Sequence, residues 1–299
     1  MTKLGVVIGI LLFVFFKLKD EDNFNEKVLA AFEEAFENSN YLYFISVIFL
    51  MPFNWLLEAK KWQVLVRPIT RLHMMGALKG VLAGLSVGFI TPHGIGTYIG
   101  RVLLITSAER SKLVGSVLLG RLLQMSATLI FGSLGVYVLL GSSFLSMYLI
   151  LLSSLLITGI ALLKLKFKTG WKWLNKLIYY IDIISTYKVK DFLNVFSLSI
   201  VRYLVFTLQF FLVLSMFVEL DALIKLAGVT WIFLAKSILP TFNFLSDLGV
   251  REVSAIYYFD NFQVPLIPVL AASLLLWLIN ILLPTLIGTP LVMKLKVDR

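Results

Sequence analysis

The sequence predicts an all-α integral membrane protein, and three observations support that class. Hydrophobic residues make up 59% of the 299 positions and charged residues only 15%, whereas charged residues form about a quarter of a water-soluble domain. Apolar residues gather in long runs, and an α-helix needs about 20 of them in succession to cross a bilayer. The charged residues gather between these runs. We therefore expect a single membrane domain over residues 1–299 with about six transmembrane helices.

The composition also excludes several classes of protein. Cysteine is absent, which removes disulfides, thiolate metal sites and cysteine nucleophiles. The formal net charge is +10, but lysine and arginine lie in short loops, where they orient membrane helices rather than bind nucleic acid. The only histidines are His73 and His93, and no phosphate-binding loop or hydrolase motif occurs. We expect no cofactor, no metal ion, no nucleic acid partner and no enzymatic activity.

The apolar runs give an ordered set of spans. In chain order the segments predicted to cross the membrane are residues 4–16, 41–57, 113–140, 143–163, 192–216 and 265–290. The third and fourth are separated only by the uncharged pair Gly141-Ser142, which predicts a tight external hairpin.

Two segments between the spans are predicted to be amphipathic helices on the membrane surface. Residues 17–40 are acidic and residues 164–191 are basic. In each, apolar residues recur about one helical turn apart, namely Phe24, Val28, Phe32 and Phe36, and then Trp171, Leu174, Ile178 and Ile181. The positive-inside rule places the acidic segment outside and the basic one in the cytoplasm. Both termini are then cytoplasmic, because a basic cluster follows the second span and another ends the chain: Lys60, Lys61, Arg67 and Arg71, then Lys294, Lys296 and Arg299.

Two further apolar segments are broken in the middle by proline and glycine. Residues 72–105 contain Thr91-Pro92-His93-Gly94-Ile95-Gly96 and have basic residues at both ends. Residues 222–260 are broken between Leu239-Pro240 and Leu248-Gly249 and have acidic residues at both ends. Because the two ends of each segment belong on one side, we predict two re-entrant helical hairpins of opposite orientation. The alternative is two ordinary spans kinked at proline.

The two halves of the chain then share one order of elements. Residues 4–140 and residues 143–290 each give span, surface helix, span, hairpin and span, and the second half is inverted. In many transporters, opposed broken helices of an inverted repeat form the substrate site near the bilayer midplane. We predict an inverted repeat with its site between the hairpins.

Charged residues within the apolar segments indicate the site, because a charge at the bilayer centre costs about 2.5 kcal/mol or more. They are Arg101, Arg121, Arg202, Asp247, Arg251 and Glu252, with Lys79 and Lys236 as weaker candidates. Arg101 follows Gly96, and Arg251 follows Gly249, so each hairpin brings a guanidinium near the start of its second helix. Free backbone N–H groups, the helix dipole and arginine together bind phosphate. A lipid phosphate is the expected ligand.

The predicted substrate-binding residues combine the two breaks with these charges. They are Thr91, Pro92, His93, Gly94, Gly96, Arg101, Arg121, Arg202, Pro240, Asp247, Gly249, Arg251 and Glu252. The alternative is that the arginines pair internally with Asp247 and Glu252 and lock the hairpins. His93 is expected to line the site as a hydrogen-bonding residue.

Over residues 41–290, these motifs resemble the transmembrane (flippase) domain of the lysylphosphatidylglycerol synthase/flippase family. The resemblance rests on the first break with Arg101, on Gly120-Arg121 in the next span, and on the late break ending in Gly249-Val250-Arg251-Glu252. It implies a lipid-translocating membrane domain. In fused members this domain moves aminoacylated phosphatidylglycerol and precedes a soluble aminoacyl-transferase domain. We expect a stand-alone member without that second domain.

Two departures from the family pattern change the expected headgroup. Thr97 stands where an acidic residue often follows the first break, and Phe244-Leu245-Ser246-Asp247 replaces the usual Pro-Gly-Gly. The excess of arginine favours an anionic or zwitterionic headgroup over a cationic lysyl headgroup. We therefore expect a flippase-like transporter of phospholipid or glycolipid in the cell membrane, whose partners are a phosphate-containing lipid and a separate transferase. The alternatives are a lipid-modifying enzyme, a subunit that presents lipid to a transferase, and a structural assembly protein.

Overall fold

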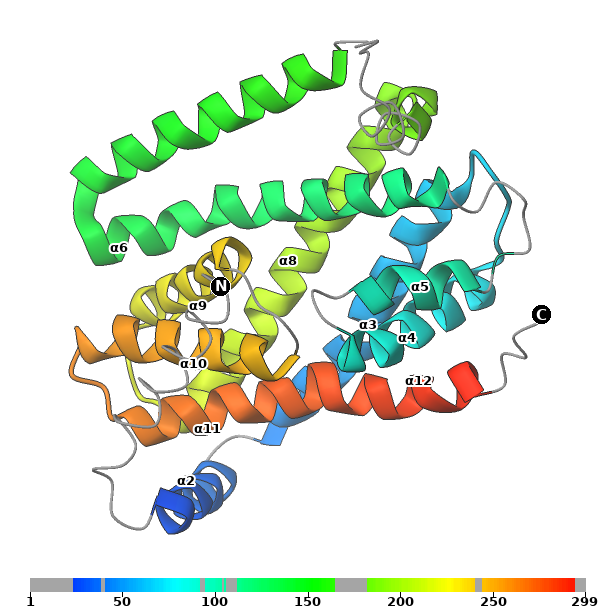
Figure 1. The fold of residues 1–299 in the computed structure, drawn as a ribbon. Coiled ribbons are helices and arrows are strands. Elements are labelled where there is room, and N and C mark those ends of the chain that lie inside the picture. The colour runs from blue at the N-terminus through cyan, green and yellow to red at the C-terminus, as the bar shows by residue number, and fades with distance from the viewer. Residues whose placement is uncertain are drawn as a thin grey trace, which may run out of the picture.

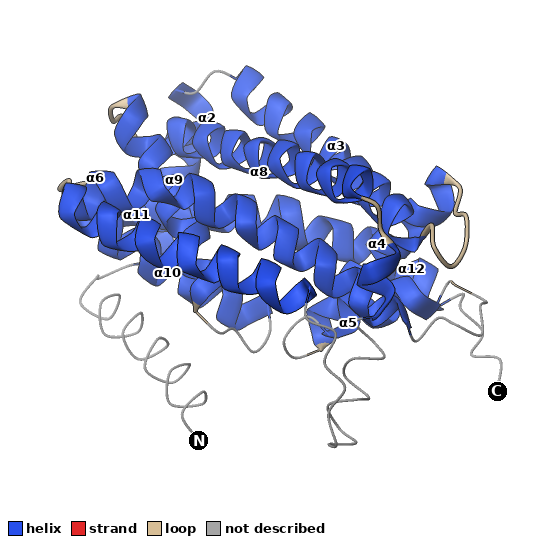
Figure 2. Ribbon diagram, turned by 90° about the horizontal axis from the view of Figure 1, so that it is seen from above, coloured by secondary structure: helices blue, strands red, loops and turns tan. Residues whose placement is uncertain are grey.

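The structure is a computed structural model that describes residues 24–38, 41–91, 95–103, 105, 112–164, 182–239 and 244–293. Within these residues every regular element is a helix, as Figure 2 shows, so the all-α prediction is confirmed for this part of the chain. The predicted first span at residues 4–16 lies outside the described residues. So does the apolar face predicted between Trp171 and Ile181.

The helices have the following bounds. In chain order they are α2 (Phe24–Asn38), α3 (Tyr41–Val66), α4 (Met74–Ile90), α5 (Ile95–Leu103), α6 (Leu113–Lys164), η3 (Asp182–Thr186), α8 (Val189–Phe217), α9 (Ala222–Ile238), α10 (Phe244–Asp260), α11 (Leu266–Trp277), η4 (Leu278–Leu282) and α12 (Leu283–Met293). Within the described residues, 4 helical segments are long and apolar enough to cross a membrane: α3, α6, α8 and the continuous stretch from α11 to α12. The chain is therefore a multi-pass helical membrane protein.

Helix α6 folds back on itself at the predicted turn. Gly141 has φ 83°, a conformation that glycine adopts without strain, and two antiparallel arms leave this point (Figure 1). Tyr148 in the second arm donates a hydrogen bond to the carbonyl of Leu129 in the first. The six-span topology as a whole stays a prediction.

Helix α3 is longer than predicted. The sequence analysis ended this span at Leu57 and placed Lys61 in a cytoplasmic basic cluster, whereas the helix continues to Val66 and Lys61 is buried. The reason is that Trp62 and Leu65, beyond the charged residues, bury their side chains in a second apolar cluster. A stretch that reads as a loop from its charges is therefore the last part of a helix.

Helices α3 and α8 pack against each other between two helix pairs, α4–α5 and α9–α10 (Figure 1). The first arm of α6 packs against α9, and α12 packs against α4. Viewed from above in Figure 2, α3 and α8 lie toward one side of the molecule and α5 and α10 toward the other. The interior of the bundle is thus reached by helices from both halves of the sequence.

Each helix pair is interrupted within the predicted break, but the second break is shorter than predicted, because α10 begins at Phe244 rather than after Gly249. The break residues 92–94 and 240–243 lie outside the described part of the chain. Helices α4, α9 and α10 each have 17 residues, which gives about 26 Å at 1.5 Å per residue, somewhat less than the hydrocarbon core of about 30 Å. The re-entrant course of the two pairs and the inverted repeat of residues 4–140 and 143–290 stay predictions.

Close backbone approach holds α4 against α5. A Cβ added at Gly84 of α4 would lie 2.7 Å from the carbonyl oxygen of Thr97, and one at Gly100 of α5 would lie 2.6 Å from that of Ala83. Small residues at such contacts let membrane helices pack backbone to backbone. The contact positions Arg101, the next residue of α5, beside α4 and within reach of α3.

The amphipathic helix predicted within residues 17–40 is present as α2 (Phe24–Asn38). Its apolar face packs on the protein, because the rings of Phe32 and Phe217 are 5.3 Å apart and those of Phe36 and Phe44 are 5.2 Å apart. The position of α2 on the membrane surface stays a prediction.

Replacing Tyr187 with phenylalanine is expected to lower the stability by about 2 kcal/mol. Tyr187 lies just before α8. Its hydroxyl donates a hydrogen bond to the carbonyl of Leu65 and lies 2.8 Å from Ser116 Oγ, and both partners are buried. Burial raises the pKa of Tyr187 to about 12, so the phenol stays protonated at neutral pH. The apparent Tm in detergent measures the loss, with the exposed Tyr137→Phe as control. An unchanged Tm would mean that this hydroxyl does not tie α8 to α3.

Candidate functional site

One face of α3 presents three polar side chains to the interior of the bundle. Asn54, Glu58 and Lys61 are spaced by four and three residues, so they lie on the same side of the helix. All three are buried. Charged residues are almost never buried without partners. The side chains that contact Glu58 and Lys61 therefore indicate a polar site.

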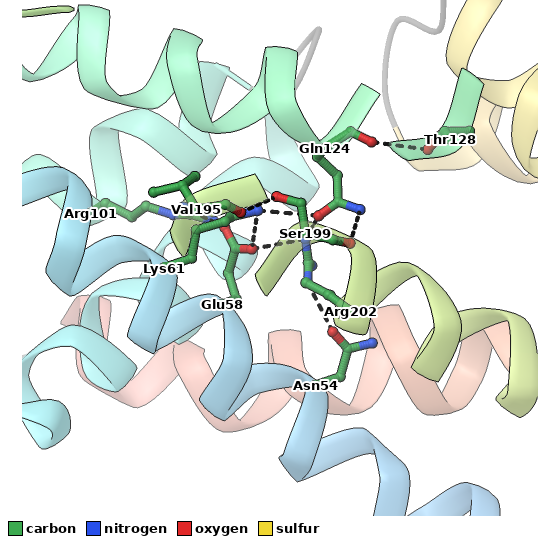
Figure 3. A network of polar contacts seen from close by, with 9 residues as sticks. All are labelled: Asn54, Glu58, Lys61, Arg101, Gln124, Thr128, Val195, Ser199 and Arg202. Carbon is green, nitrogen blue, oxygen red and sulfur yellow. Dashed lines mark hydrogen bonds and ion pairs between the residues drawn. The ribbon is translucent and has the colours of Figure 1, made fainter. Parts of the chain in front are cut away.

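Glu58 is the centre of an ion-pair network (Figure 3). Its carboxylate oxygens lie 2.8 Å from Arg101 Nη1, 2.8 Å from Lys61 Nζ and 2.8 Å from Arg202 Nη1. These cations come from α5, α3 and α8, so a single carboxylate joins three helices. Three cations share one carboxylate, which leaves an excess of positive charge inside the protein. Buried charge of this kind requires a further anion or costs stability.

Neutral side chains fix the orientation of Arg202 within this network. Arg202 Nε donates to Asn54 Oδ1 at 2.8 Å, and Gln124 Oε1 accepts from Lys61 Nζ at 3.2 Å and from Arg202 Nη1 at 3.5 Å. Gln124 itself donates to the carbonyl of Ser199 at 3.2 Å. Arg202 remains the most accessible of the four charged groups, with 21% of its side chain exposed against 6% for Glu58.

A cavity of about 300 Å³ adjoins the network. It is reached by Asn54, Gln124 and Arg202, whereas Glu58 lies behind them. Its walls come from both halves of the sequence. Helices α3, α4 and α6 contribute residues from the first half, and α8, α9, α10 and the α11–η4 segment contribute residues from the second. Aromatic and aliphatic side chains line the rest of it, among them Phe206, Phe233 and Leu276.

The cavity lining is basic. Arg202, Lys236 and Arg251 all contribute to it, and among the described lining residues there is no carboxylate. The amide nitrogens of Asn54 and Asn280, which also line it, have no hydrogen-bond acceptor among the described residues. A site rich in donors and cations is complementary to an anion with several oxygen atoms, such as a phosphate.

Asn280 lies in a π-helical turn. The N–H of Leu283 donates to the carbonyl of Leu278, five residues earlier, in place of the usual four. The cause is Pro284, which follows directly, since proline has no N–H for the Asn280 carbonyl and its ring crowds that carbonyl. Single π turns inside α-helices occur often at functional sites.

Of the four predicted arginines, two line the cavity and two are not in its described lining. Arg202 and Arg251 line the same cavity. Arg101 instead pairs with Glu58 at 2.8 Å, although the internal pairing considered from the sequence involved Asp247 and Glu252. Arg121 donates to Thr97 Oγ1 at 2.7 Å and is exposed outside the described lining.

The remaining predicted residues lie at the breaks or within the helices that follow them. The prediction that each hairpin brings an arginine near the start of its second helix is wrong, because Arg101 is in the last turn of α5 and Arg251 is the eighth residue of α10. Thr91 Oγ1 donates to the carbonyl of Val87 and accepts the N–H of Gly96, so it joins the end of α4 to the start of α5. Gly249 is buried in α10, and Glu252 of the same helix is partly exposed. Pro92, His93, Gly94 and Pro240, as well as the side chain of Asp247, lie outside the described residues.

Glu58, Lys61, Asn54 and Gln124 were missed by the sequence analysis. Lys61 was assigned to the cytoplasmic basic cluster after the second span, and the other three were given no role. The signal that could have identified them is the one-face spacing of Asn54, Glu58 and Lys61, followed by the apolar residues Trp62 and Leu65 that continue the helix.

The fold and the cavity define a polytopic helical membrane protein with a buried basic site between its two halves. The family model of the lysylphosphatidylglycerol synthase TM region matches residues 3–288, and the chain belongs to this family. The resemblance stated from the motifs is thereby confirmed, and family membership indicates a function connected with membrane lipid. A search of curated proteins and a search of solved structures each found no match.

Proposed function

We propose that this protein moves a lipid with a phosphate-containing headgroup across the cell membrane. The observation that carries the proposal is the cavity lined by Arg202, Lys236 and Arg251 beside a network in which three cations share Glu58. A phosphate in this cavity would meet guanidinium, ammonium and amide donors at once. The acyl chains would remain in the lipid, since most large side chains on the outside of the spans are apolar.

The packing of the two halves also supports transport. Helices of one half have counterparts in the other: α3 corresponds to α8, α4 to α9, and the first arm of α6 to α11–α12. The contacts correspond as well, because α4 packs on α12 and its counterpart α9 packs on α6. Such a relation is expected of an inverted repeat that opens a central site to each leaflet in turn. In this proposal the two hairpins are re-entrant and both termini are cytoplasmic.

We favour transport over catalysis for a chemical reason. An enzyme that modifies lipid needs a general acid or base within hydrogen-bond reach of the reacting atom. The described lining of the cavity offers cations, amides and hydroxyl groups, and no imidazole or carboxylate. It is equipped to hold an anion rather than to exchange protons with it.

The test is a translocation assay in vesicles that contain the purified protein. Phosphatidylglycerol, an aminoacylated phosphatidylglycerol and an uncharged glycolipid, each with a fluorescent acyl chain, are compared by chemical quenching of the outer leaflet. We expect phosphatidylglycerol to move, and Arg251→Ala to slow it by at least about 10-fold, the equivalent of one lost charge-assisted hydrogen bond. Arg67→Ala, which removes an exposed arginine outside the described cavity lining, is the control.

Two results of this assay would refute the proposal. One is that no lipid moves faster than in vesicles without protein. The other is that the uncharged glycolipid moves as fast as phosphatidylglycerol and Arg251→Ala changes neither rate, because the basic cavity would then have no part in the process.

A further inference from the structure

We propose that Glu58 is a resident counter-anion that holds Arg202 when the cavity is empty and yields it to the phosphate of an incoming lipid. The inference rests on the proposed function, because it describes how the same cavity takes up and releases its ligand. It assigns Glu58, which does not line the cavity, the role of a positioning residue.

Arg202 contacts both Glu58 and the cavity, which is the first argument. One side of its guanidinium is 2.8 Å from Glu58, while the side chain also lines the cavity and is 21% exposed. The other two cations of the network, Lys61 and Arg101, are not part of the described lining. Among the partners of Glu58, Arg202 is therefore the one that a ligand in the cavity can reach.

The second argument is the charge that remains after exchange. When a phosphate takes Arg202, Glu58 keeps Lys61 and Arg101, each at 2.8 Å, and does not become a bare buried charge. When the phosphate leaves, Glu58 is in place to pair with Arg202 again. Breaking one partner out of a buried ion pair is normally costly because the other is left uncompensated, and the surplus of cations around Glu58 avoids that cost in both states.

The third argument is the fixed position of Arg202 during the exchange. Its Nε donates to Asn54 Oδ1 at 2.8 Å, and its guanidinium lies over the Phe206 ring at 5.1 Å from the centroid. These contacts do not involve Glu58. They can therefore hold the side chain at the wall of the cavity while its terminal N–H groups change their anionic partner.

The consequence is a competition between a carboxylate and a phosphate for one arginine. Removing the carboxylate should strengthen the binding of phosphate and slow its release. Removing Lys61 should have the opposite effect on binding, because Glu58 then has fewer partners and holds Arg202 more firmly.

The experiment measures the dissociation constant of dihexanoyl-phosphatidylglycerol, a short-chain phospholipid, from the ligand-dependent rise of the apparent Tm in detergent. For Glu58→Gln we expect binding about 10-fold tighter and a lower maximal rate of translocation in vesicles. Glu58→Asp should return both values toward those of the unmodified protein. For Lys61→Gln we expect binding several-fold weaker.

The same substitutions are then repeated in an Arg202→Gln background. Because Glu58 acts through Arg202, the effects of Glu58→Gln and Lys61→Gln on binding should fall to less than about 2-fold there. A simple long-range field from Glu58 would persist without Arg202, and that result would overturn the proposal. So would equal binding in Glu58→Gln and the unmodified protein, or weaker binding in both single variants.

Two safeguards keep the outcome decisive. If Glu58→Gln does not yield folded protein, Lys61→Gln with and without Arg202→Gln tests the same coupling. If the unmodified protein translocates no lipid, the proposed function fails. If it translocates lipid but the substitutions show no coupling through Arg202, the function stands and only the role of Glu58 is refuted.

Discussion

Replacing Arg202 with alanine is expected to reduce lipid translocation roughly 100-fold in a protein that still folds. Arg202 joins the network to the cavity, so alanine removes both a phosphate ligand and the group that Glu58 positions. Two charge-assisted hydrogen bonds to phosphate together contribute about 3 kcal/mol, which is the basis of this magnitude. Folding is retained because Glu58 keeps its ion pairs with Lys61 and Arg101.

The measurement is the initial rate of fluorescent phosphatidylglycerol translocation in vesicles with equal amounts of each protein. Lys190→Ala is the matched control, since Lys190 lies in the first turn of the same helix, α8, and is exposed. Equal rates in the two variants would contradict the placement of the site at Arg202. A monodisperse profile in detergent separates loss of transport from loss of folding.

The second large effect concerns the contact between α4 and α5. Gly84→Leu is expected to lower stability by about 3 kcal/mol or more, because its Cβ alone would lie 2.7 Å from the carbonyl oxygen of Thr97 and 3.1 Å from Arg101 Cγ. The opposing atoms are backbone and the stem of the Arg101 side chain, which is held by its ion pair with Glu58, so the helices must separate. Separation would also carry Arg101 away from Glu58.

Gly76→Leu provides the matched control on the same helix. Among the described residues, no atom outside the neighbouring backbone of the same helix lies within 4 Å of the Cβ that would be added at Gly76, so the first atom of a leucine side chain meets no obstacle there. Leucine is also the better helix former by somewhat under about 1 kcal/mol, and the apparent Tm should stay level or rise. If the two variants melt at the same temperature, the backbone contact at Gly84 does not hold the pair together.

The sequence was most informative where the determining features are local. The span predicted at residues 192–216 corresponds to α8 (Val189–Phe217), and the reversal between the arms of α6 falls at Gly141, as predicted. Both rest on features of adjacent residues, a long apolar run in one case and a glycine in an uncharged turn in the other. The sites of the two helix breaks were recognised for the same reason.

The centre of the site could not be predicted from such features. Glu58 has Lys60 and Lys61 close by, and a cluster of charges after an apolar run is typical of the end of a span. That Glu58 pairs with Arg101, 43 residues later, depends on how α5 packs against α4 and how α4 packs against α3. Arg101 and Arg202 could be recognised individually as charges within apolar segments, whereas their common partner Glu58 could only be found in the folded chain.

The π turn at Leu278–Leu282 has a consequence for the whole bundle. One residue more than an α-helical turn requires rotates everything beyond it by about 100° around the helix axis. Helix α11, before the turn, packs on α8 and α10, whereas α12, beyond it, packs on α4. The continuous stretch from α11 to α12 therefore presents one face to α8 and α10 before the turn and a differently directed face to α4 beyond it, and Pro284 sets the position of this change.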